Sequence, residues 1–273
     1  MSANGHTRQS EARRPAVLFA LPDERRFFGR EYHSLSIMRG DGGVRVQHDV
    51  RWQPSVHDAE CIADAACIGV GRENAYSNTS LLLESSNPVS GVIVVGFAGG
   101  LSTSVRPGGV VVSDAVLDVG ARQQHRPDTG LLNAAAQVAV PSVQVSCGLL
   151  ATADRTLVRA AEKRELARQT GAIAVDMESA GAIAAATRYG VPWLAVRVIT
   201  DGVDDDLPFD FNAPQFKASA DPNGGVDRGR IVASALLQPW KIPALIRLGS
   251  RSSLAAKNLA LFLHALLSEL PEL

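Results

Sequence analysis

The hydrophobic residues of the chain gather in short continuous runs, several of which end in Gly, Asp or Ser. Strands that are buried on both faces have this pattern, because neither face needs a polar residue at every second position. The runs predict strands over residues 16–21, 91–96, 109–114, 142–146, 172–176 and 192–201.

Stretches typical of helices lie between several of these runs. They predict helices over residues 73–85, 156–171 and 179–190, and the glycines Gly171 and Gly190 suit the ends of the last two. Strands and helices that alternate at this spacing indicate a layered α/β fold.

The character of the sequence changes at about residue 204. Residues 204–225 are acidic and rich in Pro, Asn and Gly, which predicts a long loop or lid. Helices are predicted after it, over residues 230–238, 241–250 and 253–270, with breaks at Pro239 and Pro243. In the last helix the residues that fall largely on one face are Leu254, Leu259, Phe262, Leu263, Leu266 and Leu267.

These patterns divide the chain into three parts. We expect a disordered tail over residues 1–15, a main domain over residues 16–203, and a loop-and-helix extension over residues 204–273 that packs on the same domain. A chain of 273 residues with 46% hydrophobic residues is long enough for one large core.

Charge and composition exclude several classes of function. The formal net charge of −1 provides no overall field that would attract nucleic acid. The apolar run over residues 16–21 is too short for a signal peptide, and no stretch reaches the ~20 apolar residues of a membrane span, so a cytoplasmic protein is expected. The three cysteines and six histidines show no metal-ligand spacing, so no metal is expected.

Three acids, Asp176, Glu178 and Asp201, interrupt a stretch of mostly small and apolar residues. If residues 172–202 form a βαβ unit with parallel strands, Glu178 and Asp201 both emerge at the carboxyl edge of the sheet, where open α/β sheets bind ligands. An acid at the start of a helix is also a common cap, and this alternative stays open for Glu178. Asp176 is expected to have a structural role.

Two glycine-rich segments could approach a ligand closely. Gly96, Gly99 and Gly100 follow a buried strand, and Gly69 and Gly71 precede a helix. Neither segment has the spacing of a dinucleotide fingerprint or a P-loop, so a nicotinamide-dependent oxidoreductase is disfavoured. Ordinary tight turns explain each segment equally well.

Four stretches taken together resemble one family. They are "ALPDERRF", "GVGRENA", "GFAGGLSTSVRPGGVVVSD" and "AVDMESAGAIAAATRYGVPWLAVRVITD". They are similar to segments of the purine nucleoside phosphorylase superfamily, most closely of its 5'-methylthioadenosine/S-adenosylhomocysteine nucleosidases. The resemblance implies a three-layer α/β fold with a central mixed, twisted sheet flanked by helices. It also implies cleavage of the N-glycosidic bond of a purine nucleoside, no metal or organic cofactor, and a homodimer or larger assembly.

The resemblance also implies roles for individual residues. Asp201 would be the general acid that protonates the purine at N7, Glu178 would bind the ribose hydroxyls, and Glu24 would polarise the attacking water. The further positions implied are Met177 against the sugar, Ala98 and Gly99 beside the base and ribose, and Leu157 near the base.

The chain departs from the nucleosidases in two places. Phe97 stands where a small polar residue is common, and four arginines near the glycine segments leave inorganic phosphate open as a co-substrate. These arginines are Arg25, Arg26, Arg72 and Arg106. The long C-terminal tail resembles that of the hopanoid-associated phosphorylases, so phosphorolysis of a lipid-linked adenosine and contact with a membrane surface are alternatives. A dimer interface or an extra part of the core would explain the tail as well, and a nucleoside-binding protein without catalysis is a further alternative.

Overall fold

The computed structural model describes residues 14–28, 63–85, 89–213 and 237–270, with residues 229 and 233–234 and the backbone of 33–40 and 43–48. Residues 1–13 of the predicted disordered tail, residues 214–225 of the predicted loop, and most of the predicted helix over 230–238 lie outside these ranges.

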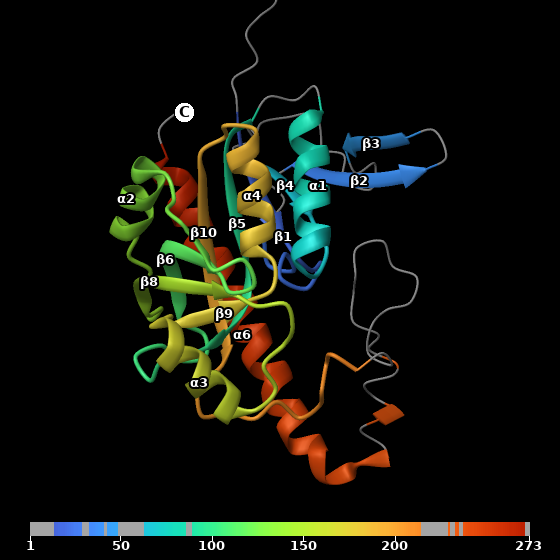
Figure 1. Cartoon of the computed structure of the whole chain (residues 1–273), viewed down its shortest axis with the longest axis vertical. Coiled ribbons are helices and arrows are strands. Elements are labelled where there is room, and N and C mark those ends of the chain that lie inside the picture. Colours follow the sequence, from blue (N-terminus) through green and yellow to red (C-terminus); the bar gives the residue numbers. More distant parts are fainter. Residues whose placement is uncertain are drawn as a thin grey trace, which may run out of the picture.

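A single mixed sheet runs through the centre of the molecule (Figure 1). Its strands are β1 (Arg14–Phe19), β2 (His33–Gly40), β3 (Gly43–His48), β4 (Asp64–Cys67), β5 (Val89–Gly100), β6 (Val110–Asp118), β7 (Gln123–His125), β8 (Val145–Thr152), β9 (Ala174–Asp176) and β10 (Trp193–Asp201). β5 pairs with β1 and β10 in parallel and with β9 antiparallel. β10, β6, β8 and β9 also pair in this order, so together with β5 they close a ring of strands. This confirms the predicted α/β fold with a mixed sheet.

One of the predicted strands is misplaced. Residues 142–146 were expected to be a strand, but β8 begins only at Val145. Ser142 has a φ of 66°, a left-handed conformation that a strand cannot contain, and the Val143 N–H donates to the Val140 carbonyl in a turn. The apolar residues of this stretch therefore straddle a turn and the start of the strand.

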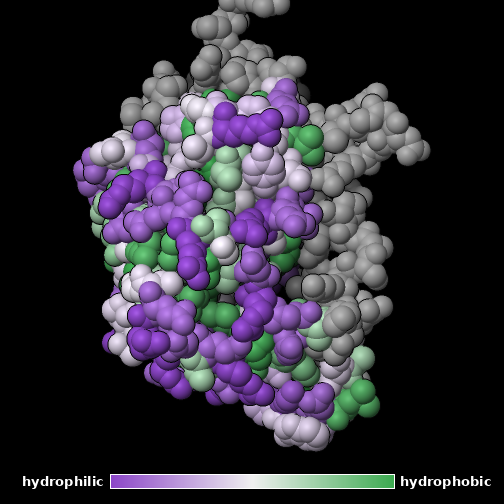
Figure 2. Space-filling view, viewed as in Figure 1, coloured by the Kyte–Doolittle hydropathy of each residue, from purple (hydrophilic) through white to green (hydrophobic). Residues whose placement is uncertain are grey.

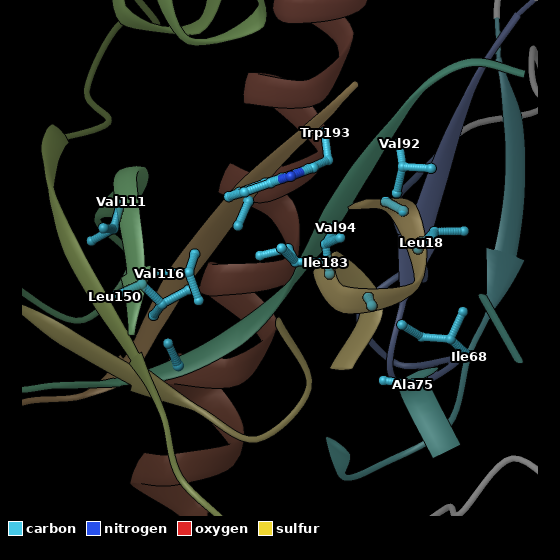
Figure 3. Packing of buried hydrophobic residues seen from close by; sticks show 14 of the residues in the cluster. Leu18, Ile68, Ala75, Val92, Val94, Val111, Val116, Leu150, Ile183 and Trp193 are labelled. Carbon is cyan, nitrogen blue, oxygen red and sulfur yellow. The ribbon is translucent and has the colours of Figure 1, made fainter. Parts of the chain in front are cut away.

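Alternate residues of the central strands face two different layers of helices. Leu18 and Val94 belong to a core cluster with Ile183 of α4 (Ser179–Arg188) and with residues of α1 (Arg72–Glu84) (Figure 3). Val17 and Val95 belong to a second cluster, which contains residues of α2 (Thr129–Gln137) and α6 (Ile242–Glu269). The sheet is thus the middle of three layers, with α6 behind it in Figure 1.

The helix α3 (Ala160–Thr170) starts four residues later than predicted. The Glu162 carboxylate accepts hydrogen bonds from the backbone N–H groups of Val158 and Arg159, at 3.0 and 2.9 Å. These bonds satisfy N–H groups at the helix start and fix where the helix begins.

The two helices predicted over residues 241–250 and 253–270 are one helix, and this prediction is wrong. Pro243 lies in the first turn of α6, where the backbone N–H that proline lacks would have no partner within the helix. Pro239 begins the short 3₁₀ helix η2 (Pro239–Lys241). The break expected at Pro243 is therefore absent, whereas at Pro239, where a break was also expected, the 3₁₀ helix η2 precedes α6.

The two halves of α6 have different surroundings. In the second half Leu259, Phe262 and Leu263 are fully buried against the sheet, whereas Leu254, predicted to lie on the same apolar face, is 48% exposed. Around the start of α6, Trp240 and Ile246 are 72% and 64% exposed, and Figure 2 shows hydrophobic residues at the lower right, where Figure 1 draws this region. None of the helices in the described part of the chain has both the length and the apolar composition to cross a membrane.

Candidate active site

A cavity of about 310 Å³ opens where β5, β9 and β10 end. Its walls come from the turn after β1, the end of β5, the turn from β9 to α4, the end of β10, and the helices α3 and α6. The seven residues that the sequence assigned to a site all line this cavity: Glu24, Ala98, Gly99, Leu157, Met177, Glu178 and Asp201.

The strands bring the acids together in a different way from the one expected. The strands before Glu178 and Asp201 were expected to be parallel to each other, but β9 runs antiparallel to β5 and β10 runs parallel to it. The acids meet because β9 and β10 flank the end of β5, where Gly99 is in register with Val175 on one side and Asp201 on the other. A Cβ at Gly99 would lie 3.3 Å from the Asp201 carboxylate, so glycine allows this close approach.

Arg197 is a fully buried cation on β10 beside the cavity. Its guanidinium lies 2.5 Å from the Asp176 carboxylate and donates to the Ser179 hydroxyl at 2.9 Å. Asp176 also accepts from the Ser179 backbone N–H at 2.9 Å, at the start of α4, and from the Thr152 hydroxyl at 2.7 Å. Asp176 thus ties β8, α4 and β10 together.

Glu24 is held by the backbone on the same side of the cavity. Its carboxylate accepts from the N–H groups of Ala20, Leu21 and Phe97, at 2.8, 2.9 and 2.8 Å. Burial raises the pKa of Glu24, although the charge of Arg197 and the three N–H groups oppose this shift. Phe97, which stands where a small polar residue is common in the nucleosidases, therefore helps to hold Glu24 through its backbone N–H.

The Glu24 carboxylate and the Arg197 guanidinium both lie against Gly96. A Cβ at this position would collide with Nη1 of Arg197 and lie 2.7 Å from Oε1 of Glu24. Nη1 is buried and has no hydrogen-bond partner among the described residues. An unpaired buried donor beside a carboxylate needs an explanation, such as a bound water or a role in a reaction.

Glu178 lies at the start of α4, and its carboxylate accepts from the Gly71 N–H at 2.9 Å. Burial, together with repulsion from Asp176 and Glu24, raises the pKa of Glu178 to about 7, although Arg197 opposes the shift. Gly71 has a φ of 89°, which favours glycine there and aims its N–H at the carboxylate. The Gly69–Gly71 segment thus positions an acid of the cavity.

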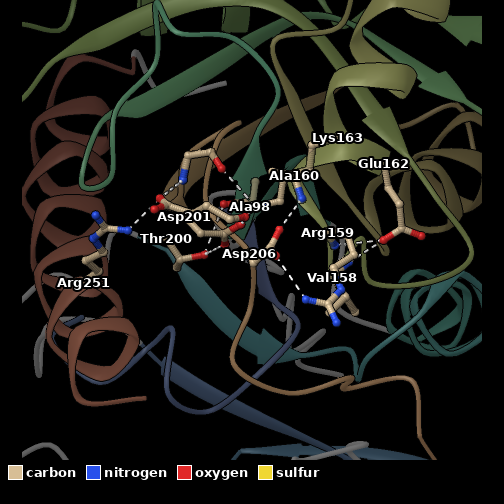
Figure 4. Close-up of polar contacts among 12 residues, drawn as sticks. Ala98, Val158, Arg159, Ala160, Glu162, Lys163, Thr200, Asp201, Asp206 and Arg251 are labelled. Atoms are coloured by element: carbon tan, nitrogen blue, oxygen red, sulfur yellow. Dashed lines mark hydrogen bonds and ion pairs between the residues drawn. The ribbon is translucent and has the colours of Figure 1, made fainter. Parts of the chain in front are cut away.

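Asp201 has a separate set of partners, drawn in Figure 4. One carboxylate oxygen accepts from the Thr200 hydroxyl at 2.7 Å, and the other forms an ion pair with the ammonium of Lys163, which is 1% exposed. Lys163 also donates to the backbone carbonyls of Gly202 and Asp205, at 3.0 and 2.9 Å.

The segment after β10 closes another part of the cavity. Asn212 accepts from the Thr156 N–H at 2.8 Å and donates to the Thr156 carbonyl at 2.9 Å, while the Thr156 hydroxyl contacts the sulfur of Met177 at 3.4 Å. Apolar lining comes from Leu207, Phe211 and Leu248. None of the four arginines considered for phosphate is among the described residues that line the cavity, although Arg155 is.

Two buried cations beside the acids, Arg197 and Lys163, were not predicted from the sequence. The burial of Arg197 could have been predicted, because a charged residue inside an otherwise apolar strand needs a partner. The burial of Lys163 had no such signal, because it is one of five charged residues from Glu162 to Arg168, a pattern typical of a solvated helix face. Its burial follows from the loop after β10, which covers it with two carbonyl groups.

Comparison with known proteins identifies the family of this chain. Residues 64–223, more than half of the chain, match the Phosphorylase superfamily. The chain belongs to this superfamily. The matched segment of this superfamily protein contains Glu178, Asp201 and both buried cations, whereas Glu24 precedes it and α6 follows it.

Individual proteins are similar to this chain in sequence or in fold. The chain is 31% identical over 163 residues to a 5'-methylthioadenosine/S-adenosylhomocysteine nucleosidase of Geobacillus thermodenitrificans, covering 52% of this chain and 68% of the relative. Its fold is similar to that of the nucleosidase of the same name from Helicobacter pylori, solved with butyl-thio-DADMe-Immucillin-A (TM-score 0.67, 17% identity, 95% of this chain and 100% of that one). It is also similar to the futalosine hydrolase of Helicobacter pylori (TM-score 0.65, 18% identity, 95% and 99% covered).

Proposed function

We propose that the protein hydrolyses the N-glycosidic bond of a 5'-substituted adenine nucleoside and releases adenine. The observation that carries this proposal is the convergence of Glu24, Glu178 and Asp201 on one cavity of about 310 Å³. The related sequence from Geobacillus thermodenitrificans, named as a nucleosidase of 5'-methylthioadenosine and S-adenosylhomocysteine, supports the choice of substrate class.

Asp201 is the proposed general acid. When the bond between the sugar C1' and the base N9 breaks, its electron pair stays on the base, which is a poor leaving group as an anion. A proton from Asp201 to N7 lets the base leave as neutral adenine. The location of Asp201 supports this role, because its carboxylate is held from two sides beside Gly99 at the cavity wall.

Glu178 is the proposed ligand of the ribose hydroxyls, with Met177 packed against the sugar. The sugar becomes positively charged as the bond breaks, in the manner of glycoside hydrolysis, and a nearby carboxylate stabilises that charge. Because the pKa of Glu178 is about 7 in the free protein, hydroxyl groups that donate to it favour the carboxylate form. Ala98, Gly99 and Leu157 are the proposed walls around the base and ribose.

Glu24 is the proposed residue that polarises the attacking water. Burial raises its pKa, which makes it a better proton acceptor near neutral pH. The unpaired Nη1 of Arg197, across Gly96 from Glu24, is a proposed second contact for the same water. The water oxygen binds C1', and its proton passes to Glu24.

Water is favoured over phosphate as the nucleophile. A phosphate dianion binds where cations or free N–H groups converge, but Glu24, Asp176 and Glu178 bring three carboxylates to this side of the cavity. The Glu24 oxygens also occupy the N–H groups of Ala20, Leu21 and Phe97.

The apolar residues Leu207, Phe211 and Leu248 are the proposed contact for the 5'-substituent. The exposed Trp240 and Ile246 near the start of α6 favour a second candidate, a lipid-linked adenosine cleaved by water or phosphate near a membrane surface. A homodimer or larger assembly stays a prediction.

The test is release of free base from methylthioadenosine, adenosylhomocysteine, adenosine, inosine and an adenosine with a long 5'-alkyl chain, with and without phosphate. Adenine release without phosphate supports the proposal, and the best substrate identifies the 5'-group. Release only with phosphate would make the protein a phosphorylase. Binding of these nucleosides without release of base would make it a binding protein.

A further inference from the structure

Lys163 is a buried ammonium group in direct contact with the proposed acid. It is 1% exposed, and its Nζ contacts one carboxylate oxygen and the two carbonyl oxygens of Gly202 and Asp205. A lysine held by these acceptors has no donor left for a substrate. Any effect on the reaction must therefore pass through Asp201.

The surroundings keep Lys163 in this place. The Asp206 carboxylate accepts from the Ala160 N–H at 2.7 Å, and the Asp205 carboxylate accepts from the Gly202 N–H at 2.8 Å (Figure 4). The first bond fastens the loop after β10 to the start of α3, and the second shapes the turn whose carbonyls bind the ammonium. Arg251 of α6 also pairs with Asp205, at 2.7 Å.

We propose that Lys163 is a positioning residue for the reaction proposed above. Lys163 orients Asp201 and stabilises the negative charge that Asp201 acquires when it protonates the base. The inference rests on the proposed function. Asp201 first takes up a proton from solvent; that proton leaves Asp201 for N7 as the electron pair of the C1'–N9 bond moves onto the base, and Asp201 returns to the carboxylate form that Lys163 contacts. The Lys163 ammonium, already in contact with this carboxylate, stabilises the charge without any rearrangement.

Other charged groups face this pair from the surrounding elements. They are Asp205 and Asp206 on the loop after β10, Arg251 on α6, and Glu24, Asp176, Glu178 and Arg197 at or beside the cavity. Of these, Arg197 pairs with Asp176 and Arg251 pairs with Asp205. Lys163 is thus the cation in contact with Asp201 among the described residues.

The test compares two leaving groups. Adenine needs a proton in order to leave, whereas 4-nitrophenolate, released from 4-nitrophenyl ribofuranoside, is stable as an anion. In Lys163→Gln the amide keeps hydrogen-bond donors near the carbonyls but removes the charge. We expect kcat for the best adenine nucleoside to fall by roughly 10- to 100-fold, with kcat for the 4-nitrophenyl riboside within about twofold of wild type. Lys163→Arg, which restores the charge, should recover part of the loss.

Arg164→Gln is the matched control. Arg164 lies next to Lys163 on α3 and pairs with Asp204 of the same loop at 2.7 Å, but both side chains are more than half exposed and neither lines the cavity. Its kcat should stay within about twofold of wild type on both substrates, because an exposed pair contributes little.

A double-mutant cycle on the adenine nucleoside supplies a second measurement. If Lys163 acts through Asp201, adding Lys163→Gln to Asp201→Asn should cause no further loss of kcat. All rates are scaled to the folded fraction from denaturation curves. Equal losses on both leaving groups, or additive losses in the cycle, would overturn the inference, whereas a wild-type protein that releases no base would overturn the proposed function instead.

Discussion

The two sides of the cavity balance their buried charges differently. On one side Asp201 has Lys163 as a cation of its own. On the other side Glu24, Asp176 and Glu178 surround Arg197, the buried cation of that side among the described residues, and only Asp176 makes an ion pair with it. Burial is the largest cause of the raised pKa values of Glu24 and Glu178, and for Glu178 repulsion from Asp176 and Glu24 adds to it. One side is therefore suited to delivering a proton, and the other to accepting one.

The largest expected effect comes from removing Arg197. Arg197→Met leaves three buried carboxylates beside an apolar side chain, and breaking a buried ion pair in this way typically lowers the free energy of unfolding by about 3–5 kcal/mol. Urea denaturation at pH 7 measures the loss. Arg168→Met, which removes an exposed arginine paired with Glu165, is the control and should leave the denaturation midpoint unchanged. A midpoint for Arg197→Met equal to wild type would show that Arg197 does not hold these acids in the fold.

The next effect is on turnover. Asp201→Asn keeps the shape of the side chain and a hydrogen-bond partner for Thr200, so the protein should fold, but it has no proton to give to N7. Release of adenine should fall by a factor of about 10² or more. The assay follows free adenine from the best nucleoside, and wild-type turnover in this variant would show that the acid lies elsewhere.

How far the sequence could predict this site depends on the kind of residue. The acids after buried strands could be found, because a carboxylate among apolar residues at a strand end needs a reason to be there. The direction of β9 could not be found, because three strand residues, Ala174–Asp176, carry no signal for parallel or antiparallel pairing. The prediction of a shared pocket was correct in spite of this, since Gly99 of β5 adjoins both strands.

Residues that act through tertiary contacts were harder to predict. Nothing in the charged sequence around Lys163 distinguishes it from its exposed neighbour Arg164. The difference arises from helix phase and from the loop that covers one residue and leaves the other in solvent. The single helix α6 was missed because the predicted division at residues 251–252 lies beside a segment that packs against the core, with Ala255 fully buried, and the helix continues through it.

Glu178 gives a pH-dependent test of the acid-rich side. Its pKa is about 7 in the folded protein and near 4.5 when unfolded, so the folded state binds the proton more tightly, and wild type loses stability as the pH rises from about 4.5 to 7. Glu178→Gln has no charge to bury. Its free energy of unfolding should therefore rise relative to wild type between pH 5 and pH 8, by at most about 3 kcal/mol.

Denaturation curves across this pH range measure the difference. Glu165→Gln, in the exposed pair with Arg168, provides the control and should give a curve parallel to that of wild type. If the free energy of unfolding of Glu178→Gln also ran parallel to that of wild type across this pH range, ionisation of the buried Glu178 would not destabilise the fold. The two sides of the cavity would then not differ in how their acids are stabilised.

The smallest effect is expected where α6 meets the acid-delivering side. Arg251 pairs with Asp205 at 2.7 Å, but both side chains are about one-third exposed, and Lys163 contacts the backbone carbonyl of Asp205 rather than its carboxylate. Arg251→Met should therefore lower the free energy of unfolding by less than about 1 kcal/mol, and the loss should shrink in high salt. Adenine release should fall only a few-fold, far less than in Lys163→Gln. A loss of turnover equal to that of Lys163→Gln would mean that α6, through Asp205, holds Lys163 in place. Arg251 would then also be a positioning residue for Asp201.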